Sequence, residues 1–215
     1  MNDAAIAQVI SQRGIPEVVH FTTNNGLVGI LRTGRLSANA FLQDEQCLRH
    51  VLKINSIDRS RDAMWLEYIN ISISRINDYF FKYSKSRVKH DDAYWCILGF
   101  DPSVMTHPGV QFATTNNAYP LTLRAMGAAG LEALFAPTIH RKPSWSTNRV
   151  VGALPFHPTC RQAEVLYPGH LSLDYLRNIY VASGDVSDEV FAQVAMLAPQ
   201  LMDKIQIVVD STKFS

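Results

Sequence analysis

The stretch Arg161-Gln162-Ala163-Glu164-Val165-Leu166 is where we expect the fold to place its chemistry. Its residues predict a short, half-buried β-strand. Because side chains alternate along a strand, Gln162 and Glu164 lie on one face while Ala163 and Val165 pack on the other. A strand of this kind is most often a sheet edge with one solvated face, so a chemical role for Glu164 depends on what the rest of the chain brings to it.

The overall composition is that of an ordinary globular protein. The chain has 215 residues, of which 47% are hydrophobic and 18% charged, which excludes a disordered or fibrous protein and fits one domain spanning residues 1–215. A net charge of +1 predicts no general attraction to nucleic acid, so such binding requires a local basic patch. Three cysteines, no signal-peptide pattern and no membrane-length apolar run favour a cytoplasmic protein with free thiols.

A strand followed directly by a helix begins near the N-terminus. Residues 17–22 alternate as a strand in which His20 and Thr22 share one face, and either Asn24 or Asn25 is expected to cap the next helix. The start of a helix suits an anionic ligand because its first N–H groups are unpaired. A histidine in a strand is more often a core residue, so His20 is informative only in combination with other features.

Three later segments have both a functional and an ordinary interpretation. In residues 68–74 the isoleucines alternate with Asn70, Ser72 and Ser74, whose polar face either lines a ligand or meets solvent. Residues 79–89 mix aromatic and basic side chains, which suit single-stranded nucleic acid but also fit core rings beside solvated cations. Residues 136–160 contain four prolines and predict a long irregular loop, which is typical of a functional or mobile segment.

Several common site motifs are missing. The sequence contains neither a Gly-x-x-x-x-Gly-Lys phosphate loop nor a Gly-x-Gly-x-x-Gly dinucleotide motif, so any nucleotide is held in another way. The absence of Gly-x-Ser-x-Gly removes the simplest hydrolase. Cys47-x-x-His50 and His157-x-x-Cys160 have zinc-ligand spacing, but isolated pairs of this kind arise by chance, and we expect no metal.

A series of short motifs follows one another between residues 16 and 182. They are His20-Phe21-Thr22, Asn25-Gly26-Leu27, Ile30-Leu31-x-x-Gly34, Arg61-Asp62, Tyr68-Ile69-Asn70-Ile71-Ser72-Ile73, Trp95 with Asp101-Pro102, Phe112 with Asn117-Ala118, and Gln162-Ala163-Glu164-Val165-Leu166. Each is weak alone, but in this order and at these separations the set resembles the DarT family of nucleic-acid ADP-ribosyltransferases.

The resemblance implies an α+β ADP-ribosyltransferase fold, with two small packed β-sheets, flanking helices and a central cleft for NAD. It also implies a cytoplasmic toxin that uses NAD to place ADP-ribose on a base of single-stranded DNA, releases nicotinamide, and pairs with the macrodomain antitoxin DarG in a toxin–antitoxin system for phage defence. The same chemistry on single-stranded RNA is the nearest alternative. A catalytically idle module that binds NAD or nucleic acid is a further one.

The resemblance also implies roles for individual residues. Catalysis falls to Glu164 and to Arg61, which pairs with it. The implied NAD-binding residues are His20, Phe21, Thr22, Asn25, Leu27 and Arg61, with Asn24 beside them. The implied substrate-binding residues are Gln162, Arg141, Lys142, Trp145 and Arg149, four of them in the 136–160 segment.

The sequence departs from the family pattern at a few positions. Arg59 is an alternative to Arg61, and Ala63 stands where the family has glycine. The Asn116-Asn117-Ala118 run contains two asparagines, and it matches the family's asparagine–alanine pattern only when the choice between them is shifted.

Transfer of ADP-ribose from NAD requires residues of these types. Breaking the bond between nicotinamide and ribose develops positive charge on the sugar, as in glycoside cleavage. A fixed carboxylate such as Glu164 stabilises that charge and can accept a proton from an exocyclic base nitrogen. An arginine suits a phosphate or the incoming base, and the Gln162 amide can read a target without adding charge.

Overall fold

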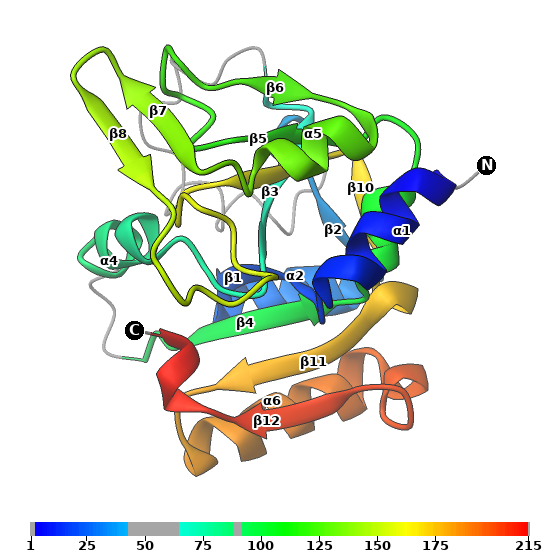
Figure 1. The fold of residues 1–215 in the computed structure, drawn as a ribbon. Helices are drawn as coiled ribbons and strands as arrows, with labels where there is room; N and C mark the ends of the chain where they lie inside the picture. The colour runs from blue at the N-terminus through cyan, green and yellow to red at the C-terminus, as the bar shows by residue number, and fades with distance from the viewer. Residues whose placement is uncertain (1–2, 43–64, 88–91, 215) are drawn as a thin grey trace.

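The computed structural model describes residues 3–42, 65–87 and 92–214, and it shows a mixed α+β fold (Figure 1). Within these residues one eight-stranded sheet has the order β12-β11-β4-β1-β3-β9-β5-β6, and two two-stranded sheets pair β10 with β2 and β7 with β8. The helices are α1 (Ala4–Arg13), α2 (Asn24–Thr33), α4 (Asp78–Lys85), α5 (Gly127–Ala133) and α6 (Gly184–Leu197). The strands are β1 (Val18–Thr23), β2 (Arg35–Ser37), β3 (Tyr68–Ile73), β4 (Trp95–Phe100), β5 (Gln111–Ala113), β6 (Arg124–Ala125), β7 (Thr138–Lys142), β8 (Trp145–Asn148), β9 (Glu164–Pro168), β10 (His170–Ser172), β11 (Leu176–Val181) and β12 (Gln206–Val209).

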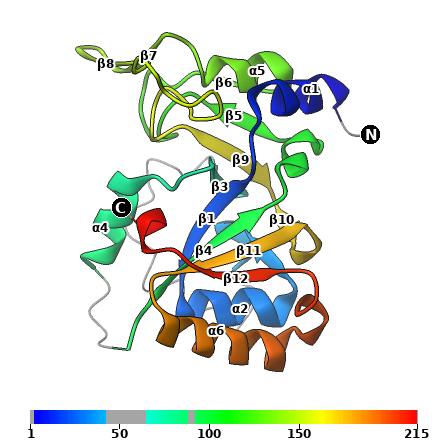
Figure 2. The same cartoon turned by 60° about the horizontal axis from the view of Figure 1, so that its bottom comes forward.

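The large sheet consists of two halves that meet at one short junction. Strand β1 pairs with β4 along its whole length, but it pairs with β3 only at Val18↔Ile73 and Val19↔Ser72. Beyond Val19 the two strands are no longer partners, so the sheet opens between β1 and β3. Figure 2 shows β9, β5 and β6 gathered on one side of this opening and β4, β11 and β12 on the other. The expected α+β fold with packed sheets is confirmed, with the difference that the two halves are joined at this junction into one continuous sheet.

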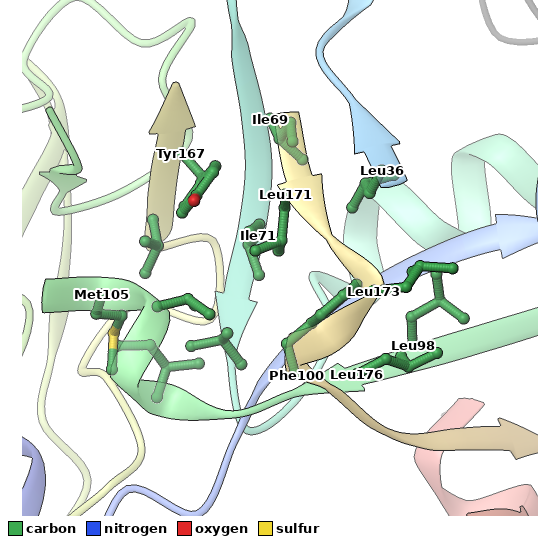
Figure 3. Close-up of a cluster of buried hydrophobic side chains, with 14 of the residues drawn as sticks. Leu36, Ile69, Ile71, Leu98, Phe100, Met105, Tyr167, Leu171, Leu173 and Leu176 are labelled. Carbon is green, nitrogen blue, oxygen red and sulfur yellow. The ribbon is translucent and has the colours of Figure 1, made fainter. Parts of the chain in front are cut away.

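Alternation along β3 decides which side of the sheet is apolar. Ile69, Ile71 and Ile73 are all buried in the main core cluster. Figure 3 shows Ile69 and Ile71 in the same apolar group as Tyr167 of β9 and Phe100 of β4. The side chains between them must therefore leave the sheet on the opposite face, and Asn70 is exposed there.

Helix α2 begins one residue earlier than expected. The sequence predicted Asn24 or Asn25 as its cap, and this prediction is wrong: the Thr23 hydroxyl accepts a hydrogen bond from the Gly26 N–H at 3.3 Å. Thr23 is the last residue of β1 and keeps an extended backbone, so its side chain reaches the third helical N–H group. Asn24 instead donates its side-chain amide to the Asp92 carbonyl at 3.1 Å.

The proline-containing segment is more regular than predicted. Residues 138–148 form the antiparallel hairpin of β7 and β8, with a register shift between His140 and Lys142. Pro143 lies in the connecting turn, where its fixed φ favours reversal of the chain. Pro137 and Pro143 therefore border the strands of a hairpin, whereas Pro155 and Pro158 lie in the connection from β8 to β9, which has no helix or strand. Among the described residues, no helix is long and apolar enough to cross a membrane.

Candidate active site

Glu164 occupies a constrained position at the start of β9. Its side chain is only 7% exposed, and its Oε2 atom accepts two hydrogen bonds. One comes from the Asn70 side-chain amide at 2.9 Å and the other from the Asn117 backbone N–H at 3.0 Å. Asn70 belongs to β3, and Asn117 belongs to the segment after β5. Strands β3 and β5 are the two that pair with β9. A carboxylate held from both sides is oriented before any ligand arrives.

His20 contacts Asn70, the residue that also binds Glu164, from the other half of the sheet. Its Nδ1 atom lies 3.0 Å from the Asn70 backbone carbonyl. A carbonyl oxygen only accepts, so Nδ1 carries the proton in this contact. His20, Asn70 and Glu164 thus form a row across β1, β3 and β9, over the place where β1 and β3 separate. The structure brings together the two residues that the sequence placed 144 positions apart.

The other residues predicted to bind NAD differ in how accessible they are. Asn25 is exposed in the first turn of α2, five residues after His20. Thr22 is 7% exposed and Leu27 is completely buried, and Leu27 belongs to the main core cluster. Phe21 packs against the rings of Phe81 and Trp95, with centroids 5.2 and 5.7 Å away. His20 therefore lies at the opening and Asn25 is accessible in the first turn of α2, while Leu27 supports the helix from the core.

The β7–β8 hairpin brings cations and an aromatic ring to the same region. Arg141 donates a hydrogen bond to the Gln162 carbonyl oxygen, and Gln162 is only 6% exposed. The Arg141 guanidinium lies 4.3 Å from the centre of the Trp145 ring, and the Lys142 ammonium lies 5.2 Å from that of Tyr119. Three of the predicted substrate-binding residues are thereby gathered above Gln162.

Arg149 has a different environment from the other predicted substrate-binding residues. Its guanidinium donates to the carbonyl of His157 at 2.8 Å and to that of Leu154 at 3.0 Å. These contacts lie within the connection between β8 and β9, so Arg149 fixes the shape of this connection. Arg149 also lies 5.8 Å from the centre of the Phe135 ring, so its contacts are to the connection and the core, whereas the hairpin cations contact Gln162, Trp145 and Tyr119.

Two residues contribute to the site in ways that the sequence did not indicate: Asn117, which was part of a quoted motif but had no assigned role, and Arg124. The Asn117 backbone N–H binds Glu164, and Arg124 of β6 binds the side-chain and main-chain oxygens of Asn117. Because arginine only donates, this contact also orients the Asn117 amide. The Asn117 Nδ2 atom is buried and has no hydrogen-bond partner among the described residues. A two-residue strand such as β6 carries no periodic signal that would have identified Arg124.

Several predicted features lie outside the described residues. These are Arg59, Arg61, Asp62 and Ala63, and also the Cys47 and His50 pair. The role of Arg61 therefore stays a prediction. Of the described cysteines, Cys96 is buried next to Thr22 in the β1–β4 pairing, and burial raises its thiol pKa to about 12, so it is a neutral packing residue.

The aromatic and basic segment after β3 proves to be the helix α4. Phe81 is buried, as the core interpretation required, but Tyr79 and Tyr83 are 68% and 53% exposed. Lys82, Lys85 and Arg87 are exposed on the same segment. The core interpretation is therefore confirmed for Phe81, and the nucleic-acid interpretation of the exposed rings and cations stays a prediction.

Comparison with known proteins identifies the family. The family model described as "DarT: ssDNA thymidine ADP-ribosyltransferase, DarT" matches residues 19–214. A search of curated protein sequences found no match.

Solved structures share the fold at low sequence identity. Thermus sp. 2.9 DarT in complex with carba-NAD+ is 15% identical, with a TM-score of 0.63 over 94% of this chain and 98% of that one. The same protein in complex with ADP-ribosylated ssDNA is also 15% identical, with a TM-score of 0.63 over 94% of this chain and 97% of that one. Thermosipho africanus DarTG in complex with ADP-ribose is 14% identical, with a TM-score of 0.59 over 93% of this chain but only 51% of that one, so the chain spans about half of its length.

These matches bear directly on the resemblance seen in the sequence. The family model covers most of the chain, and the solved DarT structures have the same fold. The expected class of enzyme, an ADP-ribosyltransferase that acts on single-stranded DNA, is confirmed. The chain belongs to the DarT family of single-stranded DNA thymidine ADP-ribosyltransferases.

Proposed function

We propose that this chain transfers ADP-ribose from NAD to a thymine in single-stranded DNA and releases nicotinamide, with Glu164 as the catalytic carboxylate. The observation that carries this assignment is the fixed carboxylate: Asn70 and Asn117 hold Glu164 Oε2 beside the opening between β1 and β3. The family description supplies the acceptor, and complexes of Thermus sp. 2.9 DarT with NAD+ and with ADP-ribosylated ssDNA supply the two substrates by analogy.

NAD is assigned to the opening between the half-sheets. His20 lies at its edge, and α2 begins immediately after β1 with its first N–H groups directed outward. A helix start of this kind favours the pyrophosphate, and Asn25 is exposed in that first turn. Arg61 remains the proposed partner of Glu164. No metal is needed, because the fixed charges of the protein stabilise the sugar cation.

The bond changes balance without any further reagent. The bond between the ribose C1 and the nicotinamide nitrogen breaks, and its electron pair neutralises the pyridinium ring, leaving positive charge on the ribose. Glu164 stabilises this charge. Thymine has no exocyclic amino group, so the base nitrogen that attacks must be the ring N3, and not the exocyclic nitrogen expected from the sequence. As N3 bonds to the ribose carbon, its proton passes to Glu164.

The hairpin is proposed to hold the target strand. The side-chain carbonyl oxygen of Gln162 accepts a hydrogen bond from Arg141, so the Gln162 side chain is left with its NH2 group to donate to a ligand. Thymine presents carbonyl acceptors, which match an N–H donor. Trp145 is 46% exposed and can stack on a base, while Arg141 and Lys142 lie beside it and can contact phosphates. Arg149 supports the connection that carries this arm.

The partner and compartment follow from this activity. NAD and DNA are intracellular, so we place the enzyme in the cytoplasm. Unchecked modification of DNA is toxic, which supports a cognate antitoxin with a macrodomain that removes the ADP-ribose, and a role in phage defence. The DarTG name of the Thermosipho africanus relative, whose chain is about twice as long, is consistent with such a pairing.

The decisive experiment incubates the protein with NAD and defined oligonucleotides and measures the mass of the products. One ADP-ribosyl group should appear on thymidine-containing single-stranded DNA, but not on thymidine-free DNA or on RNA. Glu164→Gln should lower the rate by at least about 100-fold, because the charge that stabilises the sugar cation is lost. Glu189→Gln, on the exposed side of α6, is the matched control and should be as active as the wild type. Modification of RNA alone, or an active Glu164→Gln enzyme, would contradict the proposal.

A further inference from the structure

A cavity separate from the residues described above lies at the closed end of the sheet junction. It has a volume of about 430 Å³, and its polar lining consists chiefly of Glu17, Ser74, Arg75, Asp78, Arg161 and Lys213. Arg161 precedes Glu164 by three residues in the sequence, so their Cα atoms are at most about 10 Å apart. The cavity therefore neighbours the proposed active site without containing any residue that we assign to it.

Two adjacent residues of the lining have unused hydrogen-bonding groups. Ser74 is 6% exposed, yet its hydroxyl oxygen has no partner among the described residues, and the same holds for the Arg75 Nε. Ser74 also has a φ of 61°, a left-handed conformation that non-glycine residues rarely adopt. Buried polar groups without partners are costly, so an unpaired hydroxyl and guanidinium N–H at one cavity indicate a ligand that accepts hydrogen bonds.

The charges of the lining leave one cation uncompensated. Lys213 pairs with Glu17, and Arg161 lies 3.3 Å from Asp78. Among the described residues, Arg75 has only the Pro158 carbonyl as a hydrogen-bond partner, at 3.4 Å, and it shares the charge of Asp78 with Arg161, so two anions face three cations. Burial, followed by the nearby Arg161, lowers the pKa of Arg75, but an arginine stays charged at neutral pH. Burial and the surrounding cations also lower the pKa of His157, another lining residue, which is therefore neutral.

We propose that this cavity binds one phosphodiester of the DNA strand, next to the nucleotide whose base is modified. The proposal rests on the proposed function. A phosphodiester carries one negative charge and accepts several hydrogen bonds, which matches one uncompensated arginine beside two unused donors.

The helix next to the cavity fits the same occupant. Asp78 is both a lining residue and the first residue of α4, whose exposed Tyr79 and Tyr83 rings follow directly. Figures 1 and 2 show α4 on the same side of the molecule as the β7–β8 hairpin that is proposed to hold the target. Aromatic rings beside a phosphate contact are what binding of single-stranded nucleic acid requires. A phosphate in this cavity would place the strand between the hairpin and α4.

The test compares Arg75→Gln with Arg161→Gln, whose side chain is 61% exposed and whose removal should not affect folding. Each variant should raise the KM for a thymidine oligonucleotide about tenfold and lower the slope of log affinity against log salt by about 1. The KM for NAD should not change. Arg32→Gln, on the exposed face of α2, is the matched control and should behave as the wild type.

A scan with neutral methylphosphonate linkages identifies the phosphate. One linkage next to the target should slow the wild type, and the same linkage should have no further effect on Arg75→Gln. Equal sensitivity of both proteins at every linkage overturns the proposal, and so does a rise in the KM for NAD, which would assign the cavity to the pyrophosphate. If the wild type modifies no DNA, the proposed function fails, and oligonucleotide binding measured by fluorescence anisotropy still decides whether the cavity holds a DNA phosphate.

Discussion

Replacing Asn70 tests whether the orientation of Glu164 matters for catalysis. In Asn70→Ala the side-chain donor to Glu164 Oε2, now at 2.9 Å, disappears, whereas the Asn117 N–H bond remains. The contact of His20 with residue 70 also remains, because it uses the backbone carbonyl. A hydrogen bond to a charged group is worth about 1.5–3 kcal/mol. If it holds the carboxylate in its reactive orientation, the rate of ADP-ribosyl transfer should fall about 10- to 150-fold.

Asn70→Asp should be worse than Asn70→Ala. It replaces the donor by a second carboxylate at the same distance from Glu164. Two unit charges about 3 Å apart repel by about 1 kcal/mol in water and by about 6 kcal/mol at the effective dielectric of a protein surface. Asn70 is exposed, so the lower part of this range applies. The expected order of rates is wild type, then Asn70→Ala, then Asn70→Asp.

The assay is the single-turnover rate of ADP-ribosylation of a thymidine oligonucleotide at saturating NAD. Gln206→Ala removes an amide from the exposed edge strand β12, at the far end of the sheet order from β9, and should stay within about twofold of the wild type. Melting curves confirm that each variant is folded. If Asn70→Ala keeps the wild-type rate, or Asn70→Asp is no slower than Asn70→Ala, the reasoning about Glu164 is refuted.

Three further predictions concern stability, each measured by chemical denaturation. Gly26→Ala should lower the unfolding free energy by about 1–3 kcal/mol, because its Cβ would overlap the Thr22 hydroxyl of β1. Gly184→Ala, the control, has open space in the first turn of α6 and should be neutral or slightly stabilising. Equal effects of the two substitutions would contradict the packing argument. Lys213→Met leaves the buried Glu17 without its cation and should cost about 1–3 kcal/mol, part of which the double variant with Glu17→Gln should regain. Burial lowers the pKa of His107, so the unfolded chain binds more protons below about pH 6.5 and stability should rise with pH up to that value; a His107→Gln variant with an equally steep rise would oppose this.

Much of the fold was predictable from local patterns. The alternation of isoleucines with polar residues in 68–74 correctly separated the core face of β3 from the face that carries Asn70. A strand around Glu164 was also predicted, but the prediction that it is half-buried is wrong: β9 starts at Glu164 itself, pairs with β3 and β5, and has buried side chains on both faces. Alternation is a property of a few consecutive residues, so it is visible without knowledge of the neighbouring strands.

The errors arose where two local signals competed. Asn24 and Asn25 are good capping residues, but Thr23 already had the extended backbone that a cap requires. The prolines of residues 136–160 suggested an irregular loop, yet β7 and β8 pair on either side of Pro143. In both cases the sequence contained suitable residues, and the geometry of the adjacent strand decided which of them was used.

The sequence by itself determined the types of residue at the site: a strand carboxylate, a histidine before a helix and a polar face on a third strand. Only the tertiary structure decided that β9 lies between β3 and β5, which gives Glu164 one donor 94 residues away and another 47 residues away. It also placed Ser74, Arg75, Arg161 and Lys213 around one cavity. Strand order and cavities depend on contacts between distant parts of the chain, and no local pattern of side chains encodes these contacts.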